Sequence, residues 1–105
     1  MSVSRIGYSK QAFRHIELAH EWWHKNRPKA PWLLRDEFAA SIRVIRDFPD
    51  VGIPYRHRKI PGMRKYVLLE SNYILYYIHL PVSHEVIILA LWSGDRGRNP
   101  PIRQA

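Results

Sequence analysis

The chain has 105 residues, a length typical of one domain. Hydrophobic residues make up 46% and charged residues 25%, proportions that exclude a largely disordered chain. There are 17 Lys and Arg against 9 Asp and Glu, and the net charge of +8 favours an anionic partner. The absence of Cys excludes disulfides. No apolar run reaches the ~20 residues of a membrane span, and the N-terminus lacks a signal-peptide core, so we expect a cytoplasmic protein.

The first half of the sequence predicts a strand followed by two helices. Residues 3–8 contain β-branched Val and Ile, as strands do. Ser9 can accept a hydrogen bond from a free backbone N–H, so a helix is expected from residue 10 to about 26. Its apolar residues are spaced i, i+4, i+7 and i+11, which gives one apolar stripe. The same spacing predicts a second helix from about 31 to 47, which ends before Phe48-Pro49.

The second half predicts three antiparallel strands. After an expected turn at residues 50–54, strands are predicted over 65–69, 73–80 and 86–92. Short turns join them, so they form an antiparallel meander. The last two strands are apolar at nearly every residue, which indicates burial on both faces of part of the sheet. We therefore predict one α+β domain over residues 1–105, with an N-terminal strand, a two-helix hairpin on one sheet face, the three-stranded meander, and a loop from Gly94 onward.

A cationic stretch leads into the first strand of this meander. Five basic residues occur within ten positions, and no acid occurs from Val51 to Leu69. Such a stretch can contact phosphates or the carboxylates of a partner, although runs of this kind are usually solvated surface. Three more arginines, Arg96, Arg98 and Arg103, follow the last strand. The first and last strands of a meander run the same way, so the start of one need not meet the end of the other, and a joint site is a hypothesis. The candidate partner- or phosphate-binding residues are Arg56, Arg58, Lys59, Arg64, Lys65, Arg96 and Arg98. We expect the sheet face that the helices leave open to be strongly cationic.

Some of these residues could support RNA cleavage without a metal. The reaction needs a base for the 2′-OH, a cation at the crowded phosphorane and an acid for the leaving 5′-oxygen. Arg64 and Arg96 could serve the second role, and His57 or Lys59 the first or third. The spacing alone assigns none of these roles.

Residues 20–24 read His-Glu-Trp-Trp-His, which matches the H-E-x-x-H motif of zinc hydrolases. On a helix, His20 and His24 would share a face, with Glu21 as general base. A catalytic zinc needs a third protein ligand, and Glu37 on the next helix is the nearest downstream candidate. The more ordinary interpretation is a solvated helix face beside a buried Trp23, so zinc hydrolysis is a remote alternative and we expect no metal.

Three local patterns resemble those of the RelE/ParE superfamily of bacterial toxins. Phe48-Pro49 to Gly52 is similar to the family's F-P-x-x-G after the second helix. Residues 60–67 (IPGMRKYV) and 73–77 (YILYY) are similar to its P-G-x-R-x-φ-x-φ and Y-x-φ-x-Y patterns. Residues 91–97 (LWSGDRG) are similar to its φ-φ-H-G-x-R. The resemblance covers nearly the whole chain and agrees with the order of elements predicted above.

The resemblance implies a toxin of a type II toxin–antitoxin system, neutralised by a co-expressed antitoxin that wraps a segment over it. RelE-like members cleave mRNA on the ribosome with basic residues and no metal, and ParE-like members bind and poison DNA gyrase. Arg64 and Arg96 match the arginines that RelE-like members use at the scissile phosphate, and Lys59 lies near their basic loop. These three residues are therefore the catalytic candidates if the chain is RelE-like.

Two departures from the RelE pattern favour the ParE-like alternative. Ser93 stands where many members carry His, and no Tyr, Phe or Trp follows Trp92. We therefore expect a ParE-like growth inhibitor that binds gyrase and a cognate antitoxin, uses no cofactor and does not bind a membrane. A RelE-like ribosome-dependent mRNA endonuclease is the alternative, and a basic plasmid or phage protein without toxicity is a further one.

Overall fold

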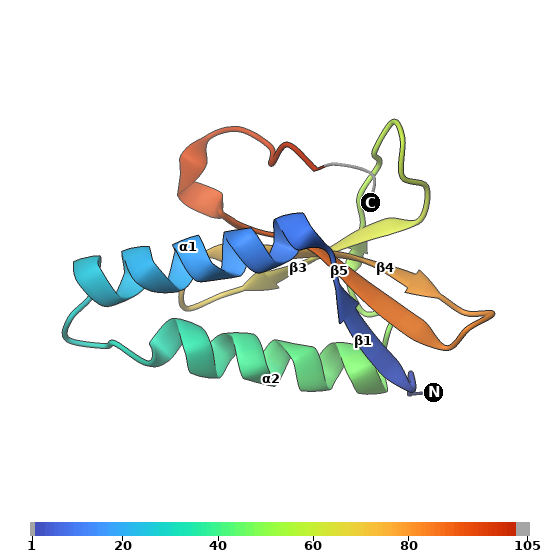
Figure 1. The fold of residues 1–105 in the computed structure, drawn as a ribbon, viewed down its shortest axis with the longest axis horizontal. Helices are drawn as coiled ribbons and strands as arrows, with labels where there is room; N and C mark the ends of the chain where they lie inside the picture. The colour runs from blue at the N-terminus through green and yellow to red at the C-terminus, as the bar shows by residue number, and fades with distance from the viewer. Residues whose placement is uncertain (1, 103–105) are drawn as a thin grey trace.

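The computed structural model describes residues 2–102, in which two helices pack on one face of a five-stranded sheet (Figure 1). The elements in chain order are β1 (Arg5–Tyr8), α1 (Lys10–Asn26), α2 (Leu33–Asp47), β2 (Ile53–Pro54), β3 (Met63–Leu68), β4 (Tyr73–Leu80), β5 (Glu85–Ser93) and the short 3-10 helix η1 (Gly94–Arg96). The strand order is β1-β5-β4-β3-β2, with β1 parallel to β5 and the other pairs antiparallel. The predicted α+β class, helix hairpin and meander are confirmed.

The structure differs from the sequence prediction at several ends. The expected turn at residues 50–54 contains β2, whose residues Ile53 and Pro54 pair with Lys65 and Arg64 of β3. Two residues are too few to show a strand period, so the pattern missed them. The second helix was predicted from about residue 31, and α2 begins two residues later, at Leu33, because a turn precedes it. The expected loop after Gly94 begins with η1.

The helices form where their capping and apolar spacing indicate. The Ser9 hydroxyl accepts the Ala12 N–H at 3.0 Å, as expected for the start of α1. Ala12 and Trp23 on the apolar stripe of α1 are buried against the sheet. The Trp23 indole N–H donates to the Ala30 carbonyl at 2.8 Å, which fixes the connection that leads into α2.

Both faces of the sheet carry a core, as the apolar sequences of β4 and β5 predicted. One core lies between the helices and the sheet and includes Leu34, Ile45 and Leu75. The other lies on the opposite face, where Ile60 from the β2–β3 loop and Ile102 from the tail pack against the sheet. The expectation of an open second face is therefore wrong over its centre, because the loop and the tail cover it.

Within residues 2–102, no helix is both long and apolar enough to cross a membrane.

Candidate functional site

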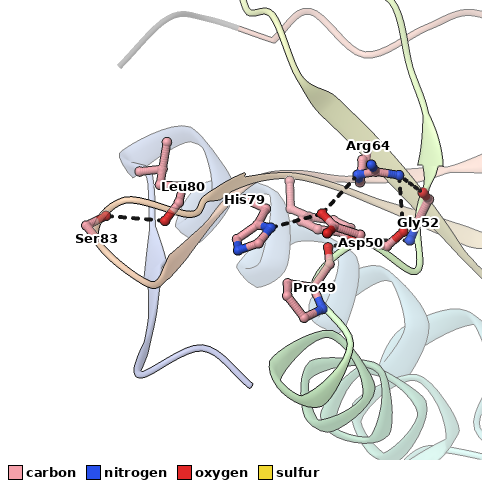
Figure 2. Close-up of polar contacts among 8 residues, drawn as sticks. Pro49, Asp50, Gly52, Arg64, His79, Leu80 and Ser83 are labelled. Carbon is pink, nitrogen blue, oxygen red and sulfur yellow. Dashed lines mark hydrogen bonds and ion pairs between the residues drawn. The ribbon is translucent and has the colours of Figure 1, made fainter. Parts of the chain in front are cut away.

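Arg64 is held by the segment that follows α2 (Figure 2). Its Nη1 donates to the Gly52 carbonyl at 2.7 Å and to the Asp50 carbonyl at 3.1 Å. Its Nε lies 3.6 Å from Asp50 Oδ1, and His79 Nδ1 lies 2.9 Å from the same oxygen. Two of the three guanidinium nitrogens, Nη1 and Nε, are therefore engaged by internal contacts. Sequence reasoning missed Asp50 and His79, because the acid-free range begins one residue after Asp50.

Tyr77 of β4 links the same segment to the sheet through two hydrogen bonds. Its hydroxyl donates to the Pro49 carbonyl at 2.8 Å and accepts the Gly52 N–H at 2.9 Å, and its side chain is fully buried. Burial raises the pKa of Tyr77 above its usual value, so the hydroxyl stays protonated and keeps both bonds. A Cβ on Gly52 would lie 2.7 Å from this hydroxyl, which gives the F-P-x-x-G pattern a steric reason in this chain.

The structure does not bring Arg64 and Arg96 together. Arg64 pairs with Tyr77 on β4, whereas Ser93 at the end of β5 pairs with Tyr73. Four residues along a strand and two strands across therefore separate Arg64 from Ser93, three residues before Arg96, by roughly 16 Å between Cα atoms. Arg96 follows in η1, with its guanidinium carbon 4.1 Å from the centre of a Trp92 ring. The two arginines proposed to share one phosphate therefore lie toward different ends of the sheet.

The remaining predicted cations divide into two groups. Arg56, Arg58 and Lys59 are exposed in the β2–β3 loop, which stands out from the sheet (Figure 1). Lys65 and Arg98 instead line one hollow of about 320 Å³ on the sheet face away from the helices. These five predicted cations therefore form two separate groups, one in the β2–β3 loop and one in the hollow.

Tyr76 lies in the hollow that Lys65 and Arg98 line. Burial raises the pKa of Tyr76, and the neighbouring Tyr55 raises it further, so its hydroxyl stays protonated at neutral pH. The hollow can accept an anion through its two cationic residues.

The zinc motif lies on α1, but its third ligand is used elsewhere. The His20 ring packs edge-on against the Phe38 ring of α2, and its Nδ1 lies 2.8 Å from the Ile16 carbonyl oxygen. Glu37 accepts the backbone N–H groups of Glu70 and Ser71 at 2.8 and 2.9 Å, and so caps the turn after β3. Over residues 2–102, no three His, Asp or Glu side chains are grouped to hold a metal.

Sequence reasoning also missed His15, which lies beside Trp92 with ring centres 5.4 Å apart. Its Nδ1 is buried and has no hydrogen-bond partner. Burial lowers the pKa of His15 below its usual value of 6.5, and the nearby positive charge of Arg96 lowers it further. His15 is therefore neutral in the folded protein at neutral pH.

Acidification is expected to destabilise the protein through His15. The imidazole binds a proton more readily in the unfolded state than in the folded state. Above the unfolded pKa of about 6.5, His15 therefore costs the folded state nothing, and the free energy of unfolding decreases as the pH falls below that value. Urea unfolding at pH values of about 7.5 and 5.5 should show that the free energy of unfolding decreases less on acidification for His15→Phe than for the wild type. As a control, Arg96→Gln should raise the pKa of His15 in an NMR titration. An equal acid loss in His15→Phe would contradict the assignment.

The fold is similar to those of several solved toxins. The isolated RelE toxin of E. coli has a TM-score of 0.59 and 16% sequence identity, and the match covers 89% of this chain and 86% of that chain. A chain of the chromosomal ParDE toxin–antitoxin system of P. aeruginosa has a TM-score of 0.63 and 12% identity, with 85% and 94% covered. A chain of the RelBE2 toxin–antitoxin complex of Mycobacterium tuberculosis has a TM-score of 0.54 and 22% identity, with 90% and 97% covered.

These likenesses show that the chain has the RelE/ParE fold, as its sequence motifs predicted. A comparison with models of protein families gives no match, and a comparison with curated proteins gives none either.

Proposed function

We propose that this chain is the toxin of a type II toxin–antitoxin system and that it inhibits growth in the ParE manner, by binding DNA gyrase. Its cognate antitoxin neutralises it in the cytoplasm. The first support is the fold, which it shares with RelE and with chains of the ParDE and RelBE2 systems. The net charge of +8 suits an antitoxin segment rich in acidic residues.

The observation that favours binding over cleavage is the placement of the arginines. A metal-independent nuclease needs its cations at one phosphate. Here the guanidinium of Arg64 is bonded to the carbonyls of Asp50 and Gly52, and Arg96 lies toward the other end of the sheet. The separation of Arg64 from Arg96 therefore favours a toxin that binds its target over a nuclease that uses Arg64, Arg96 and Lys59 at one phosphate.

A RelE-like endonuclease is the second candidate, and one observation favours it. Lys65 and Arg98 line a common hollow, where a phosphate of bound RNA would meet two positive charges. If this candidate is right, Lys65→Ala and Arg98→Ala should each abolish message cleavage, whereas Arg58→Ala in the exposed loop should not.

Expression of the gene alone is expected to arrest bacterial growth, and co-expression of the adjacent gene is expected to restore it. Purified protein should inhibit supercoiling by gyrase, and primer extension on translated messages should show no cuts that depend on the protein. Unaffected growth would overturn the toxin proposal. Growth arrest with intact gyrase activity and cut messages would instead establish the RelE-like alternative.

A further inference from the structure

A second hollow lies between α1 and the turn that follows β5. It has a volume of about 310 Å³. His15, Leu18 and Trp22 line it from successive turns of α1, and Trp92, Ser93 and Arg96 line it from β5 and η1. Of these lining residues only Arg96 belongs to the cationic groups discussed above, and of the zinc motif only Trp22 lines the hollow.

The α1 side of this hollow is an exposed apolar ridge. Leu18 is 39% exposed and Trp22 is 45% exposed, and they are four residues apart on one helix face. Exposed tryptophan next to a hollow is typical of the anchor residues that dominate protein interfaces. Burial lowers the pKa of His15, so the neighbouring imidazole adds no positive charge to the floor of the hollow at neutral pH.

Arginines lie against both tryptophans of the hollow. The guanidinium carbon of Arg27 lies 5.1 Å from the Trp22 ring centre, and those of Arg96 and Arg98 lie 4.1 and 5.8 Å from a Trp92 ring centre. The carboxylate in the lining, that of Asp95, accepts a hydrogen bond from the Asn72 side-chain amide at 2.8 Å. An apolar floor with an arginine rim fits a ligand that is apolar at its centre and anionic at its edges.

We propose that this hollow docks an acidic amphipathic segment of a protein partner. An apolar side chain of the segment enters between Trp22 and Trp92, and its carboxylates pair with Arg27 and Arg96. Trp92 is only 7% exposed, so it offers no open ring face on which a nucleic acid base could stack, and this favours a peptide. The identification of this segment as part of the antitoxin rests on the proposed function. The chemistry of the docking site does not depend on it.

The test uses a synthetic helical peptide of about 16 residues with leucines at i and i+4 and glutamates elsewhere. Titration into the full chain should shift the indole N–H resonances of Trp22 and Trp92. Trp22→Ala should raise the Kd at least about tenfold, because an interface anchor is lost. Trp32→Ala is the matched control: Trp32 is 54% exposed, also lies under an arginine, and contacts His24 on another side of α1. Its Kd should stay within about twofold of the wild type.

A second variant separates charge from packing. Arg96→Gln should weaken peptide binding and make the Kd less sensitive to added salt, since one exposed ion pair is removed. Absence of peptide binding, or equal binding by Trp22→Ala and the wild type, would overturn the docking site. So would a single-stranded oligonucleotide that binds through Trp22 more tightly than the peptide. The growth experiment decides the toxin proposal separately, so the two failures are distinguishable.

Discussion

Replacement of Gly52 by alanine is expected to lower the free energy of unfolding by about 3 kcal/mol. The new Cβ would lie 2.7 Å from the Tyr77 hydroxyl oxygen, 2.8 Å from its ring and 3.0 Å from the Lys65 carbonyl. Tyr77 cannot move aside easily, because its ring is fully buried and its hydroxyl bonds to Pro49. The substitution therefore strains the packing and also breaks the bonds that hold the segment after α2. Urea denaturation monitored by tryptophan fluorescence measures the change.

Gly7→Ala is the matched control for this prediction. A Cβ on Gly7 would meet the Cδ1 atom of Ile87 at 3.0 Å, and this is the far end of a flexible side chain. A small rotation of that side chain relieves the contact, so the cost should stay below about 1 kcal/mol. Equal effects of the two substitutions would show that the contact between Gly52 and Tyr77 is not specially constrained.

The parts of the fold predictable from sequence are those set by local chemistry. Ser9 begins α1 because its hydroxyl accepts a backbone N–H within the same turn. The spacing of apolar residues on both helices and the uninterrupted apolar sequence of β5 likewise depend on near neighbours. By contrast, β1 pairs in parallel with β5, where Arg5 faces Glu85. No local pattern encodes a contact between residues so far apart in the chain.

The candidate site was less predictable, because it depends on which charges meet. The acid-free stretch suggested that Arg64 is free to bind a partner, yet Asp50, just before that stretch, lies beside it. The neighbouring Lys65 points to the opposite face, since successive residues of a strand alternate. Adjacent cations in the sequence thus have separate roles: Arg64 contacts the segment after α2, and Lys65 lines a hollow with Arg98. The alternation of side chains along β3 separates them.

Replacement of Arg64 by alanine is expected to lower the free energy of unfolding by about 2 kcal/mol. The main loss is the charge-assisted hydrogen bonds to the carbonyls of Gly52 and Asp50. The Asp50 carboxylate contributes less, because its side chain is 65% exposed and the ion pair is 3.6 Å long. Arg64→Lys should recover only part of the loss, since the lysine side chain ends one atom short of the Nη1 that donates both bonds, and it has no counterpart of the Nε that faces Asp50.

Arg64 could stabilise the fold or contact the target. Measuring both the free energy of unfolding and growth inhibition on the same variants distinguishes the two roles. Arg58→Ala, in the exposed loop, is the control and should change the free energy of unfolding by less than about 0.5 kcal/mol. If Arg64 is structural, Arg64→Ala loses growth inhibition only to the extent that it loses folded protein, and lower temperature restores both. A fully folded Arg64→Ala variant without growth inhibition would instead place Arg64 at the target, and the internal hydrogen bonds would then have to open on binding.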